Sequence, residues 1–254
     1  MSPEMTIRIF ASARGVMDWA ARTLVEVAAS AEGRPVCVAL SGGSTPERLY
    51  RMLAEERESE VPWDRLEVFF GDERAVPPEH VESNYRLAFD NLLSRVPVRA
   101  ERVHRIRAEE RDLSRAAREY EEIVRSRVPA GPDGLPSFDL VWLGVGSDGH
   151  TASLFPGSPA LREERRLVAE TIDPRTGAPR VTFTLPLLNA ARRVQFLVVG
   201  ESKSEIAKTI LGPGRAGGEE PPAARVSPAA GDLEWLLDRA AASGIQDPGL
   251  IAGS

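Results

Sequence analysis

The chain has 254 residues, of which 42% are hydrophobic and 28% are charged, close to the average for folded globular proteins. Its formal net charge is −6, which argues against a nucleic-acid-binding surface spread over the whole molecule. If the ligand is anionic, the basic groups that bind it must therefore be gathered locally.

The cysteine content limits the disulfides and metal sites that the chain can form. Cys37 is the single cysteine, so an internal disulfide and a cysteine-rich metal site are both excluded. It lies in the apolar run VCVAL, where we expect a small buried core residue.

The first residues, MSPEMTIRIF, lack the pattern of a signal peptide, and no apolar run approaches the ~20 residues that cross a bilayer. We expect a cytoplasmic protein without membrane contact.

Apolar runs and helical spacing alternate along the first half of the chain. Residues 16–31 carry apolar or small side chains at helical spacing and end near Gly33 and Pro35. The charged stretch 109–127 has one apolar face, which predicts an amphipathic helix. The expected strands are 7–10, 36–40, 66–70 and 103–106, and the expected helices are 16–31, 44–53, 84–93 and 109–127.

The second half continues the alternation. Surface loops are expected from composition at 129–137 and 211–222. A strand that begins at Leu140 is followed by a helix, then by strands 180–185 and 194–199 and by helices 203–211 and 232–242. Strands that alternate with helices predict a mostly parallel sheet covered on both faces. No repeat is evident, and we expect one domain over residues 1–254.

The segment LVWLGVGSDGHTASLFP, residues 140–156, is the main candidate for the functional site. Its apolar start is typical of a buried parallel strand, and its glycines allow a tight turn and a close approach to a ligand. Ligands bind at the carboxyl ends of strands in an open α/β sheet, so His150 is expected in a cleft beside the carboxylate of Asp148. The alternative is an ordinary polar turn. His80 and His104 are interpreted as structural or surface residues.

The segment SGGSTPE follows a strand and opens a helix. Gly42 and Gly43 leave backbone N–H groups uncovered at the positive end of the helix, which predicts an anion site for a phosphate. Ser44 and Glu47 match a capping box, so the phosphate interpretation rests on backbone amides and Thr45 as much as on the Ser44 hydroxyl. The spacing matches neither the P-loop nor the dinucleotide fingerprint.

Two further strand ends carry charge. In GDERAVPP, Arg74 is a candidate phosphate ligand and Asp72 a candidate partner for a base or a sugar hydroxyl, with an ordinary loop ion pair as the alternative. Lys203 follows the strand 194–199, where its ammonium group is placed to reach a substrate phosphate, whereas Lys208 is expected to face solvent.

Four segments, in this order, resemble the 6-phosphogluconolactonase family. They are SGGSTP (41–46), GDERAVPP with SNY (71–85), GVGSDGHTASLFP (144–156) and RVTFTLPLLNAARRVQFLVVGESK (180–203). The related glucosamine-6-phosphate deaminases share the DGH motif, but they typically have Glu where this chain has Phe155 and Tyr where it has Arg74. The resemblance implies a Rossmann-like three-layer α/β/α domain with a mostly parallel central sheet, acting without a metal or an organic cofactor.

The resemblance also implies an activity, the hydrolysis of 6-phospho-D-glucono-1,5-lactone in the oxidative pentose phosphate pathway. His150 would act as general base, with either Asp148 or Asp72 holding its tautomer, and backbone N–H groups at 146–149 would bind the carbonyl oxygen. The implied substrate-binding residues are Gly42, Gly43, Ser44, Thr45, Arg74, Gly146, Gly149, Lys203 and Arg180. No nucleic acid and no obligate protein partner is implied.

Three alternative functions have less support from the sequence. A deaminase or isomerase acting on an amino-sugar phosphate would need an additional acid–base carboxylate near His150, and Phe155 occupies the obvious position. A non-catalytic sugar-phosphate sensor should carry an added DNA-binding domain and a basic face. A metal hydrolase has little support from three widely separated histidines.

Overall fold

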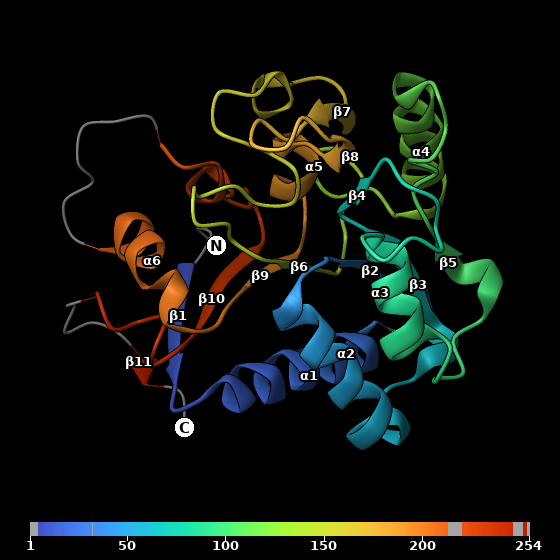
Figure 1. The fold of residues 1–254 in the computed structure, drawn as a ribbon. Coiled ribbons are helices and arrows are strands. Elements are labelled where there is room, and N and C mark those ends of the chain that lie inside the picture. Colours follow the sequence, from blue (N-terminus) through green and yellow to red (C-terminus); the bar gives the residue numbers. More distant parts are fainter. Residues whose placement is uncertain (1–4, 32, 213–219, 246–250, 253–254) are drawn as a thin grey trace.

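The computed structural model describes residues 5–31, 33–212, 220–245 and 251–252. In this part of the chain, eight strands form the main sheet in the order β11-β1-β10-β9-β6-β2-β3-β5 (Figure 1), and every neighbouring pair is parallel. The strands are β1 (Met5–Phe10), β2 (Val36–Leu40), β3 (Leu66–Phe70), β5 (Val103–His104), β6 (Leu140–Leu143), β9 (Arg193–Val198), β10 (Asp232–Asp238) and β11 (Ile251–Ala252).

The central strands are buried on both faces, which explains their continuous apolar sequences. All residues of β2, β3 and β6 are buried, and Cys37 lies among them as expected. Trp142 of β6 and Trp235 of β10 are among the largest fully buried side chains. Burial of each such side chain stabilises the fold by roughly 1.5–3 kcal/mol. The predicted strands of the first half are confirmed within a few residues.

Six α-helices connect and cover the strands within the described residues. They are α1 (Ala13–Ser30), α2 (Ser44–Glu56), α3 (Asn84–Ala88), which a π-helical turn (Phe89–Leu93) extends, α4 (Leu113–Arg127), α5 (Leu185–Asn189) and α6 (Ser204–Leu211). In the view of Figure 1, α1 and α2 lie below the main sheet, and α4 and α5 lie above it. Short 3-10 turns occupy Glu58–Glu60, Trp63–Arg65, Ala100–Arg102, Pro159–Arg162, Glu201–Lys203 and Pro222–Arg225. None of the described helices is long and apolar enough to span a membrane.

A second, three-stranded sheet stands beside the first. Its order is β4 (Asp72–Arg74), β8 (Pro179–Phe183), β7 (Val168–Ile172), and both pairings are antiparallel. The strand expected at 180–185 therefore exists, but it belongs to this sheet and not to the parallel one. The sequence analysis missed β4 and β7, and β4 is too short to show a strand period.

Three local predictions were wrong. Residues 232–242 were expected as a helix, but 232–238 form β10, which pairs with β1 and β9 along its edges. Its residues after Asp232 are buried on both faces, so the alternation typical of a half-exposed strand is absent. The helix expected after β6 is a series of turns and one 3-10 turn. Ser44 does not cap α2, because Gly43 occupies the N-cap position and Ser44 is already helical. In the predicted loop 211–222, residues 213–219 lie outside the described residues, and the extent of the domain stays a prediction.

The strand order fixes where a ligand can bind. From β2 the chain moves outward to β3 and β5 on one side, and β6 then pairs with β2 on the other side. The direction of winding therefore reverses between β2 and β6. In open α/β sheets, such a reversal leaves a crevice at the carboxyl ends of the two strands. Ser41 follows β2 and Gly144 follows β6 at this point.

Candidate active site

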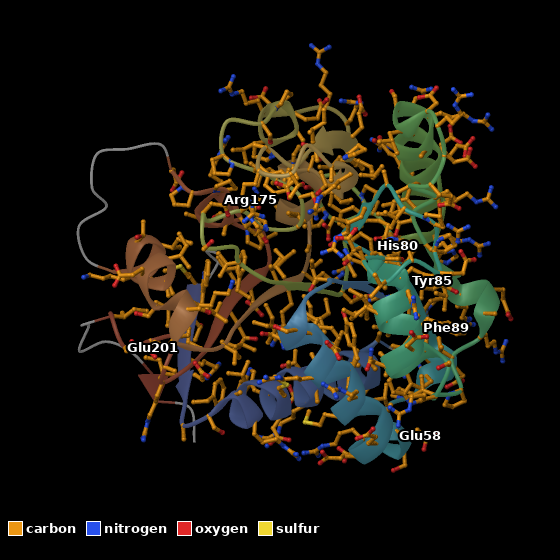
Figure 2. The ribbon with its side chains drawn as sticks, in the orientation of Figure 1. Glu58, His80, Tyr85, Phe89, Arg175 and Glu201 are labelled. Atoms are coloured by element: carbon orange, nitrogen blue, oxygen red, sulfur yellow. The ribbon has the colours of Figure 1, made fainter. Side chains whose placement is uncertain are left out.

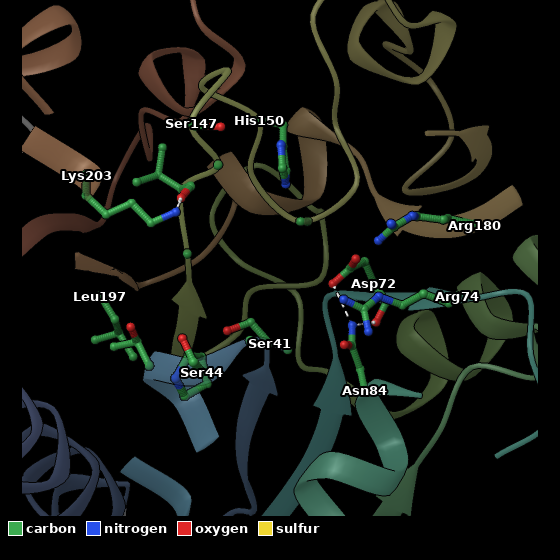
Figure 3. Close-up of a pocket in the computed structure, with 18 of the residues that line it drawn as sticks. Ser41, Ser44, Asp72, Arg74, Asn84, Ser147, His150, Arg180, Leu197 and Lys203 are labelled. Atoms are coloured by element: carbon green, nitrogen blue, oxygen red, sulfur yellow. Dashed lines mark hydrogen bonds between the residues drawn. The ribbon is translucent and has the colours of Figure 1, made fainter. Parts of the chain in front are cut away.

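A pocket opens at the carboxyl ends of β2, β3 and β6, at the reversal point (Figure 3). Of the residues predicted for the site, all except Asp148 and Gly149 line it. Four polar residues of the lining, Ser41, Asn84, Ser147 and Arg175, were not selected by the sequence analysis.

The pocket is strongly cationic. Arg74, Arg175, Arg180 and Lys203 line it, against the single carboxylate of Asp72. The whole chain has a net charge of −6, so this cluster is the local gathering of basic groups that an anionic ligand requires.

The His150 ring is held by two neighbours. Its Nδ1 lies 2.5 Å from Oδ1 of Asp148, and its ring centroid lies 4.9 Å from that of Phe155. Since an ionised carboxylate only accepts hydrogen bonds, Nδ1 is the donor and Nε2 is left unprotonated in the neutral ring. Figure 3 shows the ring reaching into the pocket. His150 thus presents a basic nitrogen to a ligand.

Asp148 stays ionised in this arrangement. Burial acts to raise the pKa of Asp148, but its contacts with His150, above all the hydrogen bond from the ring, outweigh burial and bring the pKa below its ordinary value. Arg175 lies 4.0 Å from the other carboxylate oxygen. Of the two aspartates left open by the sequence, Asp148 is the one that contacts His150.

The loop after β6 is shaped around this ring. A Cβ on Gly146 would lie 2.2 Å from the His150 ring, so the close approach requires glycine. Gly149 has φ +81°, and Ala152, which lines the pocket, also has a positive φ of 47°. Left-handed backbone is costly for alanine and is held here by the surrounding structure.

Hydrogen bonds within the loop decide which backbone donors are available. The Gly146 amide donates to the carbonyl of His150 at 2.8 Å, and the Gly149 amide donates to Gly146 at 3.0 Å. Both glycines therefore close the turn instead of offering their amides to a ligand. The amides of Ser147 and Asp148 have no acceptor among the described residues, and Ser147 lines the pocket.

The second functional loop joins β2 to α2. Gly43, with φ +107°, is the N-cap of this 13-residue helix, and no side chain caps it. The amides of Ser44 and Thr45 therefore begin the helix without an intrahelical acceptor and lie in the pocket wall. A Cβ on Gly42 would lie 1.8 Å from Oδ1 of Asn84, so glycine is required at 42 as well.

Lys203 lies on the same side of the pocket as Ser44 (Figure 3). Its Nζ donates to the carbonyl of Val145 at 2.9 Å. Burial lowers the pKa of Lys203, and the negative charge of Asp148 partly offsets this effect. The uncapped N-terminus of α2 and this ammonium group together place hydrogen-bond donors and positive charge on one side of the pocket.

Asp72 is buried and fully engaged. Asn84 donates to its Oδ1 at 3.0 Å, and the hydroxyl of Ser153 donates to its Oδ2 at 2.6 Å. The neighbouring Glu73 accepts bonds from the backbone of Asn84 and Tyr85 at the start of α3, and burial raises its pKa. Glu73 is thus a structural residue, whereas Asp72 faces the pocket.

Arg74 and Arg180 enter the pocket from the small sheet. Arg74 Nη1 donates to the carbonyl of Glu82, and Arg180 Nη2 donates to Asp173 at 2.8 Å. Arg175 comes from the turn between β7 and β8, and Figure 2 shows it well apart from the exposed His80. No sequence signal selected Arg175, because only the hairpin brings it to the pocket.

The family model described as glucosamine-6-phosphate isomerases/6-phosphogluconolactonase matches residues 11–235. The chain belongs to this family. Its relatives include a 6-phosphogluconolactonase of Bos taurus, 41% identical over 93% of this chain and 92% of the relative. Another, from Nostoc sp., is 39% identical over 86% of this chain and 88% of the relative.

Solved structures of the family confirm the predicted fold. The 6-phosphogluconolactonase from Trypanosoma cruzi superposes with a TM-score of 0.83 at 31% identity, covering 97% of this chain and 99% of that one. A monomeric glucosamine-6-phosphate deaminase shares the fold with a TM-score of 0.77 at 22% identity. Since both activities occur on this fold, the choice between them depends on the side chains of the site.

Proposed function

We propose that the chain hydrolyses 6-phospho-D-glucono-1,5-lactone to 6-phospho-D-gluconate. The observation that carries the proposal is the His150–Asp148 pair, whose second imidazole nitrogen faces a pocket lined by four cationic side chains. Relatives named 6-phosphogluconolactonase, which align over most of the chain, support it.

The reaction follows from the state of the imidazole. Nε2 of His150 takes a proton from a water molecule as the water oxygen bonds to C1 of the lactone. The tetrahedral intermediate then collapses, the bond between C1 and the ring oxygen breaks, and the imidazolium returns the proton to that oxygen. The carboxylic acid so formed loses a proton to solvent and leaves as a carboxylate.

Asp148 supports both proton transfers. Its hydrogen bond holds Nδ1 as the donor, and its negative charge stabilises the imidazolium that forms when water is deprotonated. Partial burial beside the pocket does not neutralise this carboxylate, because its contacts with His150 lower its pKa. Asp148 is therefore a positioning residue, and it acts on the substrate only through His150.

Phosphate binding is assigned to the other loop. The free amides of Ser44 and Thr45 point from the positive end of α2, and the ammonium group of Lys203 adds a full charge. The phosphate is remote from C1, so these contacts serve mainly to hold the lactone carbonyl against His150.

The deaminase alternative lacks its acid–base group here. Phe155 is buried and packs against the His150 ring at the position where a carboxylate would be needed. The remaining pocket carboxylate, Asp72, is engaged with Asn84 and Ser153. The proposed reaction involves a small sugar-phosphate lactone and needs neither nucleic acid nor a protein partner, and the cytoplasmic location stays a prediction.

The test is direct lactone hydrolysis. The lactone is generated in place by glucose-6-phosphate dehydrogenase, and its decay is followed with wild-type protein, with His150→Ala and with buffer alone. We expect rapid decay with wild type and a rate near that of buffer with the variant. Wild-type decay no faster than buffer would overturn the proposal and make amino-sugar phosphates the next substrates to assay.

A further inference from the structure

Two arginines lie opposite each other on adjacent strands of the small sheet. Arg74 of β4 and Arg180 of β8 are register partners in an antiparallel pair, and both line the pocket. Like charges directly opposite each other destabilise a sheet unless something compensates for the repulsion. No salt bridge joins Arg74 to a carboxylate in the described part of the chain, and Arg180 has Asp173 alone.

In each guanidinium, a terminal nitrogen has a hydrogen-bond acceptor and Nε has none. The terminal nitrogens donate to Glu82 and Asp173, as described above. The Nε atoms of Arg74 and Arg180 are buried and have no hydrogen-bond partner among the described residues. A buried unpartnered N–H of a charged group is costly, and in a pocket wall it indicates a missing acceptor.

The pair is separate from the anion site at α2. Figure 3 shows Arg74 and Arg180 on one side of the pocket, next to Asp72, and Ser44 and Lys203 on the opposite side. The pocket therefore offers two cationic regions to one ligand.

The two regions differ in chemistry. Backbone amides at a helix end together with an ammonium group suit a tetrahedral phosphate, and guanidinium forks bind carboxylates as well as phosphates, so a phosphate held at α2 leaves the arginine pair for a carboxylate. If the function proposed above holds, the product carries one of each, a phosphate at C6 and a carboxylate at C1. We propose that Arg74 and Arg180 form a carboxylate subsite, which binds the C1 carboxylate of the product and the negative oxygen that precedes it in the tetrahedral intermediate.

This placement separates binding from catalysis. The lactone carbonyl is neutral in the ground state and becomes charged only as water adds to C1. The arginine pair therefore stabilises the transition state more than the bound lactone, which raises kcat, whereas Lys203 binds a phosphate whose charge does not change and so mainly lowers KM.

The experiment compares two ligands that differ at C1. Calorimetry measures the Kd of 6-phosphogluconate and of glucitol 6-phosphate, which has a CH2OH group in place of the carboxylate, for wild type, Arg180→Met and Lys203→Met. We expect Arg180→Met to raise the Kd of 6-phosphogluconate by about 10–100-fold and to leave the Kd of glucitol 6-phosphate within about twofold of wild type. Lys203→Met should weaken both ligands by the same factor.

Arg74→Met provides the second variant, because it leaves the contact between Arg180 and Asp173 in place. It should show the same selectivity as Arg180→Met, and an unchanged melting temperature verifies its fold. Equal weakening of both ligands in the arginine variants would overturn the subsite and assign the pair to the phosphate, and no weakening of either ligand would also overturn it. Binding needs no turnover, so a failed lactone assay with the expected selectivity would reject the proposed reaction and not the subsite.

Discussion

Among the described residues, two histidines of the main sheet or of the loops that follow its strands lie in close contact with a carboxylate. His150 contacts Asp148 after β6, and His104 of β5 contacts Glu67 of β3 through Nε2. Both rings also lie against a phenylalanine, Phe155 for His150 and, with centroids 4.7 Å apart, Phe69 for His104. The local motifs are thus alike, and only one of them lies in the cationic pocket.

The difference lies in position and surroundings. The His104 and Glu67 side chains are 10% and 7% exposed, whereas His150 and Asp148 are 20% and 28% exposed. His104 lies at the edge of the sheet, away from the reversal between β2 and β6. A histidine beside a carboxylate therefore does not by itself mark a site in this fold, and the topology of the sheet decides which pair lies at the pocket.

The largest expected effect on activity comes from replacing His150. His150→Asn removes the general base, and kcat should fall by about 10²–10⁴-fold with little change in KM. Steady-state kinetics on the lactone measure both constants. A variant that keeps more than a tenth of wild-type kcat would reject His150 as the base.

Asp148→Asn tests the positioning role of the carboxylate. The amide can no longer stabilise an imidazolium, and kcat should fall by roughly 10–10³-fold while KM stays near wild type. Glu67→Gln is the matched control in the other pair and should retain kcat. Equal losses in both variants would mean that general destabilisation, and not the local role of Asp148, lowers the activity.

Gly146→Ala tests the shape of the loop. The added methyl would meet the His150 ring at 2.2 Å and must displace it. A shift of about 1 Å in a catalytic group can cost ~10²-fold in rate, so we expect a loss of that order with product binding retained. Full activity in this variant would show that the ring need not lie where the structure places it.

His104→Asn should act on stability alone. It shortens the side chain that contacts Glu67, leaving a largely buried carboxylate without its donor, and the free energy of unfolding should fall by about 1–3 kcal/mol. Urea titration measures the loss, and kcat should stay at the wild-type value. Loss of activity in the folded variant would make the two pairs functionally coupled.

The smallest expected effect is the pH dependence of stability. Because the pKa of Asp148 is lowered on folding, its contribution to stability is complete above its ordinary value of 3.8 and is lost as the pH falls from there through the lowered value. Urea midpoints from pH 6 to pH 3 should therefore fall less steeply for Asp148→Asn than for wild type. A steeper fall in the variant would contradict the direction of the shift.

The sequence predicted the strands that carry the site because those strands are buried on both faces. Short, mostly apolar runs followed by glycines mark β2, β3 and β6, and the pocket residues Ser44, Asp72 and His150 come within a few residues of the carboxyl ends of these strands. The helix prediction at 232–242 is wrong for the same reason, because β10 is buried on both faces and shows no alternation of apolar and polar residues.

Side-chain geometry supplied what the sequence left open. The choice between Asp72 and Asp148 depends on which carboxylate the ring meets, and both follow strands, so spacing alone does not decide it. Arg175 and the pairing of Arg74 with Arg180 arise from an antiparallel sheet that joins distant segments. No local pattern encodes such a pairing.

The most direct test follows the C1 resonance of the lactone by NMR in the presence of equal amounts of wild type, His150→Asn and His104→Asn. The account predicts that wild type and His104→Asn convert the lactone to the acid at the same rate, whereas His150→Asn leaves decay close to that of buffer. Loss of conversion in both variants to the same degree, or in neither, would contradict it.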